Sequence, residues 1–345
     1  LGSISDRGRA RRKFLFGMAG IGIASTASFF FVAQGQWFFA LAVYVIAIIG
    51  FEGSVTFYDS LLVGVAGDSR KEFVSAVGYS AGYLGGGLLF TVNVLMAQKP
   101  EWFGLADASQ AVRLSFLSVA VWWFVFTIPL ALWVKEPEVA DAVSGGKAIK
   151  EGLRELWITI REVRTLKMAA LFLLAYWLYI DGVHTIVRMA VDYGLSIGFD
   201  SGTLITALLI TQFVGFPATI VVGKLGEKIG AKRAIYVCIG VYCGVTIGGF
   251  FMSEPHHFYY LAATIGLAQG GVQALSRAFY IDLIPANRAA QFFGFYNMLG
   301  KFAAVLGPAI TGVVAMATGS SRLSILALIV LFIGGGVLFT LVDPE

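Results

Sequence analysis

The chain has 345 residues, of which 58% are hydrophobic and only 13% charged, and its formal net charge is +4. Soluble domains carry about 25% charged residues, so this composition excludes a soluble domain and gives no indication of a nucleic-acid partner. The two cysteines, Cys238 and Cys243, lie in one apolar stretch, which provides neither a disulfide framework nor a metal site at the usual Cys and His spacing.

Ten segments are long and apolar enough to cross a bilayer as helices, which takes about 20 residues each. In chain order they are 13–33, 36–64, 72–97, 112–134, 166–190, 201–223, 233–252, 257–282, 291–317 and 321–342. The sequence therefore predicts an all-α, polytopic membrane protein embedded in the lipid bilayer.

The basic residues predict the orientation of these spans, because cytoplasmic loops are enriched in Lys and Arg. Of the 25 Lys and Arg residues, 19 fall in alternate loops, three fall in the opposite loops and three fall inside spans. We therefore expect the loops richer in these residues to be cytoplasmic, together with the C-terminal tail. They are 1–13, 65–71, 135–167, 224–233 and 283–290.

Residues 135–165 separate four predicted spans from six. The segment is polar up to Lys150 and then places apolar residues at helical spacing, which predicts an amphipathic helix at the cytoplasmic interface. We expect an N-terminal bundle of four helices over 1–134, this linker, and a C-terminal bundle of six helices over 166–345. If the two bundles are equivalent, two further spans are expected to precede Leu1.

A short charged loop occurs twice, 221 residues apart. Its matched positions are Gly2 and Gly223, Asp6 and Glu227, Arg11 and Lys232, and Arg12 and Arg233. Each copy directly precedes an apolar span, and an acid near a helix N-terminus is favoured by the helix dipole. The repeat indicates two related bundles in one chain; a plain orientation signal is the alternative.

Few polar or charged side chains fall inside the spans, where they are costly and usually functional. Those that share a helix face are Glu52 and Asp59; Asp181, His184 and Arg188; Gln269, Gln273 and Arg277; and Asn297 and Lys301. Lipid cannot solvate these groups, so we expect the four stripes to face a shared interior and to line a path for ions and solute.

Three of these residues suggest proton chemistry. Glu52 and Asp181 are candidate proton carriers, because a carboxylic acid in a dry cavity keeps its proton more readily than one in water. For Asp181 the alternative is a structural ion pair with Arg188 on the adjacent turns. His184 is a candidate proton relay, with an ordinary hydrogen-bonded contact as its alternative.

Two cations suggest how a solute is held. Arg277 and Lys301 are candidate ligands for a solute carboxylate, since a guanidinium can give a carboxylate two hydrogen bonds. The alternative is a gate near the cytoplasmic mouth in which they pair with Asp282 or Asp59.

Other residues predict contacts between helices. Gly78, Gly82 and Gly86 recur every four residues, a spacing that lets helix backbones approach closely. A sliding surface for conformational change is the alternative. Asn93 and Gln212 are expected to form interhelical hydrogen bonds.

Several of these segments resemble a known family. The loop from Gly223 to Arg233, GKLGEKIGAKR, resembles the signature loop of the major facilitator superfamily. Its first copy is similar, but its second glycine comes one position early. The segments 78–87, 181–188, 270–277 and 292–308 resemble the vacuolar effluxer branch of that superfamily, which comprises autophagy-type amino-acid permeases and their bacterial relatives.

The resemblance implies the fold and the function of several residues. We expect a major facilitator fold of two helix bundles, with ten of its twelve transmembrane helices in this chain. In the family the repeated loop clamps the cytoplasmic helix ends in one conformational state. This assigns a cytoplasmic gate to Gly2, Asp6, Arg12, Gly223, Glu227, Gly230 and Arg233.

The same resemblance implies a secondary active transporter, and not an enzyme. It is expected to move a small solute by alternating access, coupled to protons or another ion, with amino-acid efflux as one possibility. We expect a monomer in the cell membrane rather than the vacuolar membrane, without cofactor or metal. The alternatives are a sugar or drug transporter of the same fold and a non-transporting membrane receptor or scaffold.

Overall fold

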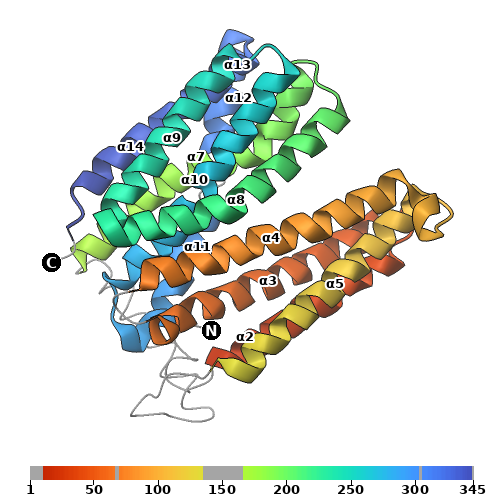
Figure 1. The fold of residues 1–345 in the computed structure, drawn as a ribbon, viewed down its shortest axis with the longest axis horizontal. Helices are drawn as coiled ribbons and strands as arrows, with labels where there is room; N and C mark the ends of the chain where they lie inside the picture. The colour runs from red at the N-terminus through yellow and green to blue at the C-terminus, as the bar shows by residue number, and fades with distance from the viewer. Residues whose placement is uncertain (1–10, 67–69, 135–165, 303–304, 344–345) are drawn as a thin grey trace. The chain divides into compact units, whose positions relative to one another are not determined.

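The computed structural model describes residues 11–66, 70–134, 166–302 and 305–343, and these residues form helices and connecting turns without a β-strand (Figure 1). The long helices of the first part are α2 (Arg11–Ser28), α3 (Trp37–Val65), α4 (Lys71–Gln98) and α5 (Ala108–Trp133). Those of the second part are α7 (Lys167–Ser196), α8 (Ser201–Ile229), α9 (Ala231–Phe251), α10 (Pro255–Ile281), α11 (Ala289–Phe302), α12 (Leu306–Thr318), α13 (Ser321–Ala327) and α14 (Ile329–Thr340). Short 3₁₀ turns, at Phe29–Phe31, Pro100–Phe103 and Ala286–Arg288, connect some of them.

The predicted all-α membrane fold is confirmed. Within the described residues, nine helical spans are long and apolar enough to cross a membrane, and nine of the ten predicted segments coincide with them. The remaining predicted segment, 257–282, forms α10. This helix has 27 residues, enough to cross a membrane, but it is not among the nine apolar spans; its sequence includes Gln269, Gln273 and Arg277. Two of the spans contain an interruption: α11 is followed by α12, and α13 by α14.

The contacts between helices divide the chain into two compact units. The described residues of 11–65, 88–134 and 286–294 form unit 1, and those of 66–87, 166–285 and 295–343 form unit 2. These units do not follow the predicted bundle boundaries at 134 and 166, which stay a prediction. The first part of α4 belongs to unit 2, and the first part of α11 belongs to unit 1.

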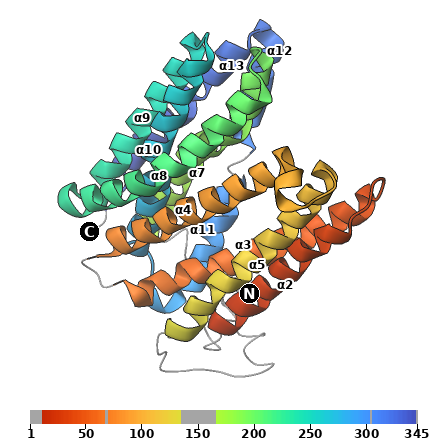
Figure 2. The ribbon, with the colours of Figure 1, turned by 45° about the vertical axis from the view of Figure 1, so that its right-hand side comes forward.

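Unit 1 is built on the pairing of α2 with α3 and α5 (Figures 1 and 2). The backbones of α2 and α3 meet at two glycines, because a β-carbon built on Gly50 would overlap the backbone of Gly22. Leu15, Phe57 and Leu61 form its buried apolar cluster. The predicted interhelical bond of Asn93 is confirmed: its amide oxygen accepts a hydrogen bond from the Ser118 hydroxyl at 2.9 Å.

Unit 2 has an aromatic core between α7, α10, α11 and α14. The rings of Tyr176 and Tyr296 stack with centroids 4.3 Å apart, and Phe172 stacks on Tyr280 at 5.7 Å. The Tyr179 hydroxyl shares a 2.6 Å hydrogen bond with the hydroxyl of Ser276 in the same buried layer. Large aromatic side chains therefore fix α7 against its neighbours and position the polar residues that α7 carries.

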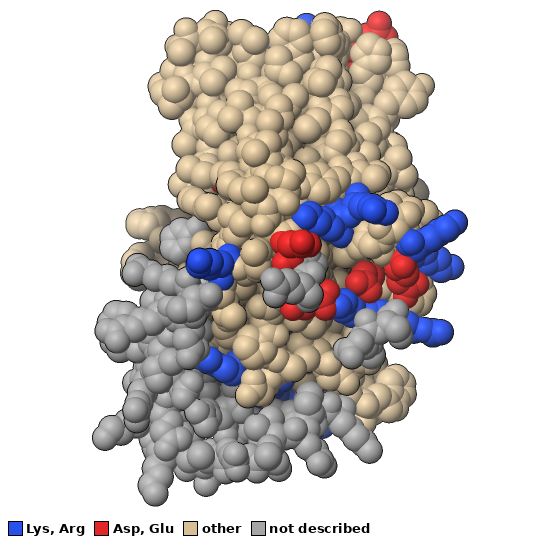
Figure 3. Space-filling view, turned by 90° about the vertical axis from the view of Figure 1, so that its left-hand side faces the viewer, with Lys and Arg blue, Asp and Glu red and all other residues tan. Residues whose placement is uncertain are grey.

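Most of the exposed side chains on the helices are apolar, which suits contact with lipid. Examples are Trp37, Phe124 and Val221, of which 72%, 57% and 65% of the surface is exposed. On the face drawn in Figure 3, acidic and basic side chains gather in one region, and a broad tan area has none. Charges avoiding a wide apolar surface are expected where that surface lies in hydrocarbon.

The first part of α4 packs closely on α8 and α10 within unit 2. A β-carbon on Gly223 would overlap the methyl group of Ala76, and the ring of Tyr83 lies where a β-carbon on Gly215 would be, at 3.0 Å. The expected role of the α4 glycines themselves is wrong at Gly82, because a β-carbon there would meet nothing within 4 Å. Small residues do allow the close approach, but they belong to α8 and α10.

Candidate functional site

The polar stripe of α7 is centred on Asp181, the fifteenth of the helix's 30 residues. The residue is completely buried. One carboxylate oxygen accepts hydrogen bonds from the backbone N–H of Gly307 at 2.9 Å and from the hydroxyl of Thr185 at 3.1 Å; the other accepts from the N–H of Leu306 at 2.9 Å. The side chain of α7 thus caps the first turn of α12.

This cap is needed because α12 begins in the middle of a membrane-length span. That span covers Ala286–Thr318, and α12 starts at Leu306. Its own N-cap residue, Val305, provides no side-chain hydrogen bond. The first N–H groups of a helix have no partner within the helix, and hydrocarbon offers them none. The predicted pair of Asp181 with Arg188 is therefore secondary to the bonds with α12.

His184 and two cations lie on the same side of α7 as Asp181. Arg188 on α7 and Lys301 on α11 are both exposed, and both act electrostatically on the His184 ring. In the described part of the chain, Nδ1 of His184 is buried without a hydrogen-bond partner, while the backbone of Gly300 is hydrogen-bonded to the ring. The structure thus brings together the predicted stripes of α7 and α11.

Asn297 lies one turn before Lys301 on α11 and is half-buried. It belongs to the part of α11 that packs in unit 2. The candidate site therefore lies in unit 2, on α7 and α11. It consists of an acid that caps a helix, an imidazole, an amide and two exposed cations.

The third polar stripe, on α10, lies in a different environment, in which its arginine is buried against α4. Arg277 is buried; its Nε donates to the Ser75 hydroxyl at 3.0 Å and one terminal nitrogen to the Ser75 carbonyl at 3.1 Å. Its guanidinium also lies 4.7 Å from the centre of the Tyr79 ring. These contacts bind the guanidinium to α4, and both predicted roles of Arg277, carboxylate binding and gating, stay predictions. Asp282, one of the predicted partners, pairs with Lys71 instead.

Of the two glutamines of α10, Gln273 binds protein groups, whereas among the described residues the side-chain oxygen of Gln269 is buried without a hydrogen-bond partner. The Gln273 side chain donates to the carbonyl of Gln269 at 3.1 Å and is hydrogen-bonded to Tyr83. Gln212 of α8 lies against α4, because a β-carbon built on Gly87 would be 3.2 Å from the Gln212 β-carbon. The interhelical hydrogen bond expected of Gln212 stays a prediction.

The fourth stripe lies in unit 1, on α3. Asp59 is buried, with 3% of its surface exposed, and Glu52 is half-buried. Both residues interact with other groups of the protein. Their predicted roles as proton carrier and gate residue stay predictions.

The repeated loop can be followed in its second copy. Gly2 and Asp6 lie outside the described residues, and Arg12, at the start of α2, donates to the carbonyl of Ala131 at 2.6 Å. In the second copy Glu227 and Arg233 are exposed.

Gly230 begins α9 in this loop with a φ of +89°, a value that favours glycine. Glu227 of the same loop acts electrostatically on Glu72 of α4. Gly223 provides the close contact of α8 with α4 described above. The gate assigned to these residues stays a prediction.

Sequence reasoning missed several residues that hold the sites in place. Lys232 donates to the carbonyl of Thr340 at 3.1 Å and so binds the C-terminal end of α14. Ser75 and Ser80 bind α10 and α8; the Ser80 hydroxyl donates to the carbonyl of Phe216 at 2.7 Å. Serines bonding across to a neighbouring helix leave no period in the sequence that could have revealed them.

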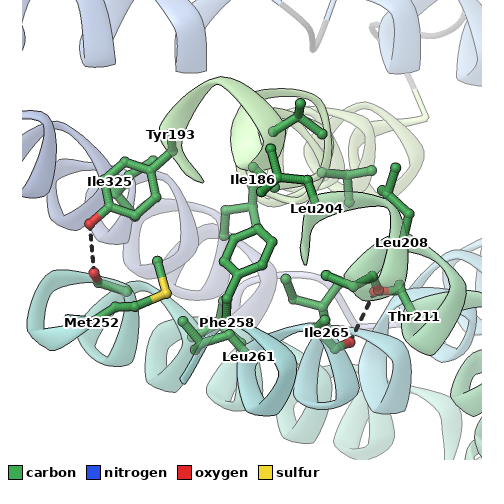
Figure 4. Close-up of a pocket in the computed structure, with 17 residues that line it drawn as sticks. Ile186, Tyr193, Leu204, Leu208, Thr211, Met252, Phe258, Leu261, Ile265 and Ile325 are labelled. Carbon is green, nitrogen blue, oxygen red and sulfur yellow. Dashed lines mark hydrogen bonds between the residues drawn. The ribbon is translucent and has the colours of Figure 1, made fainter. Parts of the chain in front are cut away.

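Unit 2 also contains an apolar cavity of about 70 Å³ between α7, α8, α9, α10 and α13 (Figure 4). Its two hydroxyl groups are already bound: Tyr193 donates to the Gly249 carbonyl at 2.7 Å, and Thr211 to the Ala262 carbonyl at 3.1 Å. A buried water needs two to four polar partners, so this cavity is a dry packing void and does not belong to the polar site.

Comparison with known proteins identifies relatives over the whole chain. The model of the family described as "Vacuole effluxer Atg22 like" matches residues 1–71 and 65–345. The "Uncharacterized MFS-type transporter YxiO" of Bacillus subtilis (strain 168) is 37% identical over 354 residues, covering 100% of this chain and 80% of that protein. "Autophagy-related protein 22" of Yarrowia lipolytica is 28% identical and covers 79% of this chain. The chain spans about half, 50%, of that relative.

Solved structures of major facilitator transporters share the fold. The transporter FucP, solved in the outward conformation, superposes with a TM-score of 0.72 at 11% identity, covering 100% of this chain and 86% of FucP. The proton:xylose symporter XylE gives 0.73 at 13% identity, covering 99% and 82%. At these identities the likeness shows the fold alone.

Proposed function

Because the chain belongs to the vacuole effluxer Atg22-like family of major facilitator transporters, we propose that it moves a small solute bearing a carboxylate, such as an amino acid, by alternating access. The transporter class follows from the family. The solute, a driving gradient of protons or another ion, and outward direction are the proposed part. The family description as an effluxer supports the direction.

The observation that carries the proposed solute class is the pair of exposed cations, Arg188 and Lys301. They stand on two membrane-length spans of unit 2, beside the half-buried His184. A charged side chain within a membrane span faces water, a partner charge or a ligand, since hydrocarbon does not solvate it. Two cations can hold a carboxylate through charge-assisted hydrogen bonds. Among the two cations first considered for this role, Lys301 keeps it, and Arg188 replaces the buried Arg277.

The orientation and the assembly are proposed on the same footing. The charged loops, including the one with Glu227 and Arg233, face the cytoplasm in our proposal, because Lys and Arg collect on that side. The protein acts as a monomer in the cell membrane, and the bacterial relative supports that membrane over a vacuolar one.

Transport by the full-length protein in proteoliposomes tests the proposal. Uptake of labelled amino acids, a sugar and a cationic drug is compared with and without a pH gradient. We expect an amino acid to be transported, and Arg188→Gln and Lys301→Gln to raise its KM about tenfold. Arg322→Gln is the matched control, because this arginine is also exposed but lies at the start of α13 and is not part of the proposed pair. Unchanged KM in both variants, or transport of the sugar alone, would refute the proposed solute class.

A further inference from the structure

The inference concerns the contact between Asp181 and α12, and it rests on the proposed transport function. Both carboxylate oxygens act as acceptors: one for the N–H of Leu306, the other for the N–H of Gly307 and the hydroxyl of Thr185. In all three of these hydrogen bonds the neighbouring group donates and the carboxylate accepts. The geometry therefore matches the ionised acid, which only accepts; the protonated acid keeps fewer acceptor sites and carries an O–H donor.

The fit around the carboxylate is close. A β-carbon on Gly307 would overlap the Thr185 hydroxyl and would lie 2.8 Å from a carboxylate oxygen of Asp181. A side chain at this position would separate α12 from α7. Phe332 of α14 packs on Gly182, the residue that follows the acid on α7.

Three charged or titratable groups face this region. Arg188 acts electrostatically on the carboxylate from the same helix, and His184 lies one turn from the acid on α7. Lys301, from α11, acts on His184. The described first turn of α12 has no acidic residue, and the contact from α14 is the apolar Phe332. The negative charge on Asp181 is thus stabilised by donors and cations, while no neighbouring acid competes for the proton.

We propose that Asp181 is a proton-binding site whose charge state is read by the N-terminus of α12. A proton from water binds one carboxylate oxygen and forms an O–H bond. That oxygen then turns a donor toward α12, so an N–H of Leu306 or Gly307 loses its acceptor. The released N–H then lacks its carboxylate acceptor in a buried site, where an unpaired donor is costly. Protonation therefore loosens α12 from α7, and loss of the proton restores the cap.

This role differs from that of a proton carrier that only pairs with a solute or a cation. The proton changes the hydrogen bonding of a helix that starts in mid-span, so it changes the position of a structural element. The device couples proton binding to the conformational change that alternating access requires.

Four variants of the full-length protein test the proposal. Asp181→Asn removes the titration. Thr185→Val removes one donor and keeps the two N–H bonds. Gly307→Ala separates the helices without changing a titratable group. Asp192→Asn is the matched control, because it is an exposed acid on the same helix.

The first measurement is solute transport in proteoliposomes between about pH 4 and pH 8. We expect Asp181→Asn to lose the pH dependence of transport, and Asp192→Asn to keep the wild-type profile. Thr185→Val should shift the profile to higher pH, because the carboxylate loses a donor that favours its charged form. Gly307→Ala should lower transport at every pH. A wild-type profile in both Asp181→Asn and Thr185→Val would overturn the proposal.

The second measurement reads the cap directly and does not need a known solute. Hydrogen exchange of the peptide that contains Leu306 and Gly307 is followed in membranes of wild type and variants. We expect protection at neutral pH that falls about tenfold in Asp181→Asn, the loss expected for one net hydrogen bond. Equal protection in the two proteins would overturn the cap. If protection falls but no solute is transported by the wild type, the proposed function fails and the cap stands.

Discussion

Arg277 on α10 and Ser75 on α4 are joined by two buried hydrogen bonds in unit 2. The guanidinium donates to both the hydroxyl and the carbonyl of Ser75, and that hydroxyl donates in turn to the carbonyl of Ala274 at 2.7 Å. Ser75 is fully buried and Arg277 has 3% of its surface exposed. A helix of the first half of the sequence is thus fixed to a helix of the second half by one buried guanidinium.

We expect Arg277→Lys to destabilise the protein by about 2–3 kcal/mol, because an ammonium cannot reproduce the two parallel hydrogen bonds and leaves buried groups without partners. Thermal unfolding in detergent measures the loss. Arg322→Lys, an exposed position, is the control and should leave the melting temperature unchanged. Equal stability of wild type and Arg277→Lys would show that the hydrogen bonds between Arg277 and Ser75 do not hold α4 in place.

The packing of the Tyr83 ring against Gly215 and Gly270 gives a second prediction. A β-carbon on Gly270 would lie 2.6 Å from the Tyr83 ring and would also overlap Thr219, so Gly270→Ala should destabilise by about 2–3 kcal/mol through overpacking. Gly82→Ala is the matched control on α4, where the added methyl meets nothing within 4 Å. It should be neutral or stabilise by about 0.5–1 kcal/mol through helix propensity. Melting temperatures are measured side by side; a Gly270→Ala protein that melts no lower than Gly82→Ala would show that Tyr83 and Thr219 leave room for the added methyl group.

The apolar cavity predicts that an added methyl group can be favourable. Ala207 lines it, and a void of about 70 Å³ costs at most about 1.7 kcal/mol at 24 cal/mol per Å³. We expect Ala207→Val to raise the free energy of unfolding by up to about 1 kcal/mol. Ala234→Val is the counterpart at a fully buried alanine outside the cavity and should be destabilising. Destabilisation of similar size at both positions would mean that the void is not available to a side chain.

One prediction concerns pH outside the membrane. Asp200 caps α8; the Thr203 hydroxyl at 2.6 Å and the N–H groups of Thr203 and Gly202 hold the pKa of its carboxyl below the usual 3.8. A lowered folded-state pKa adds stability that is present above pH 3.8 and is lost as the pH falls through the folded value. Asp200→Ala should therefore be less stable than wild type at pH 7, and the difference should close in acid. A difference that persists at the lowest pH would exclude the carboxylate as its source.

Much of the fold could be predicted because each span is long and apolar, and that signal does not depend on tertiary contacts. The stripes of α7 and α11 were predicted for the same reason, since lipid makes an isolated His184 or Lys301 conspicuous. The capping role of Asp181 was not predictable, because it depends on the start of α12 within a continuous apolar segment. Gly307 and Pro308 indicate a kink in the segment 291–317 close to the start of α12, but no pattern along the segment shows that an acid of α7 caps it.

Arg277 shows the opposite limit. Its spacing from Gln273 correctly indicated a polar helix face, but did not reveal that Arg277 is hydrogen-bonded to Ser75 of α4. A pattern along one helix defines a face and leaves open which neighbour occupies it. For the same reason Gly82 of α4 was assigned a close contact that it does not make, while glycines of α8 and α10 allow such contacts.

Competition for transport tests the central claim most directly. In proteoliposomes with the full-length protein, uptake of a labelled amino acid is measured against an excess of the same amino acid, its amide and the amine that lacks the carboxylate. The account predicts that the amino acid competes fully, while the amide and the amine compete at least about tenfold more weakly, because Arg188 and Lys301 bind the carboxylate. Equal competition by the amine, or no specific uptake of any amino acid, would contradict it.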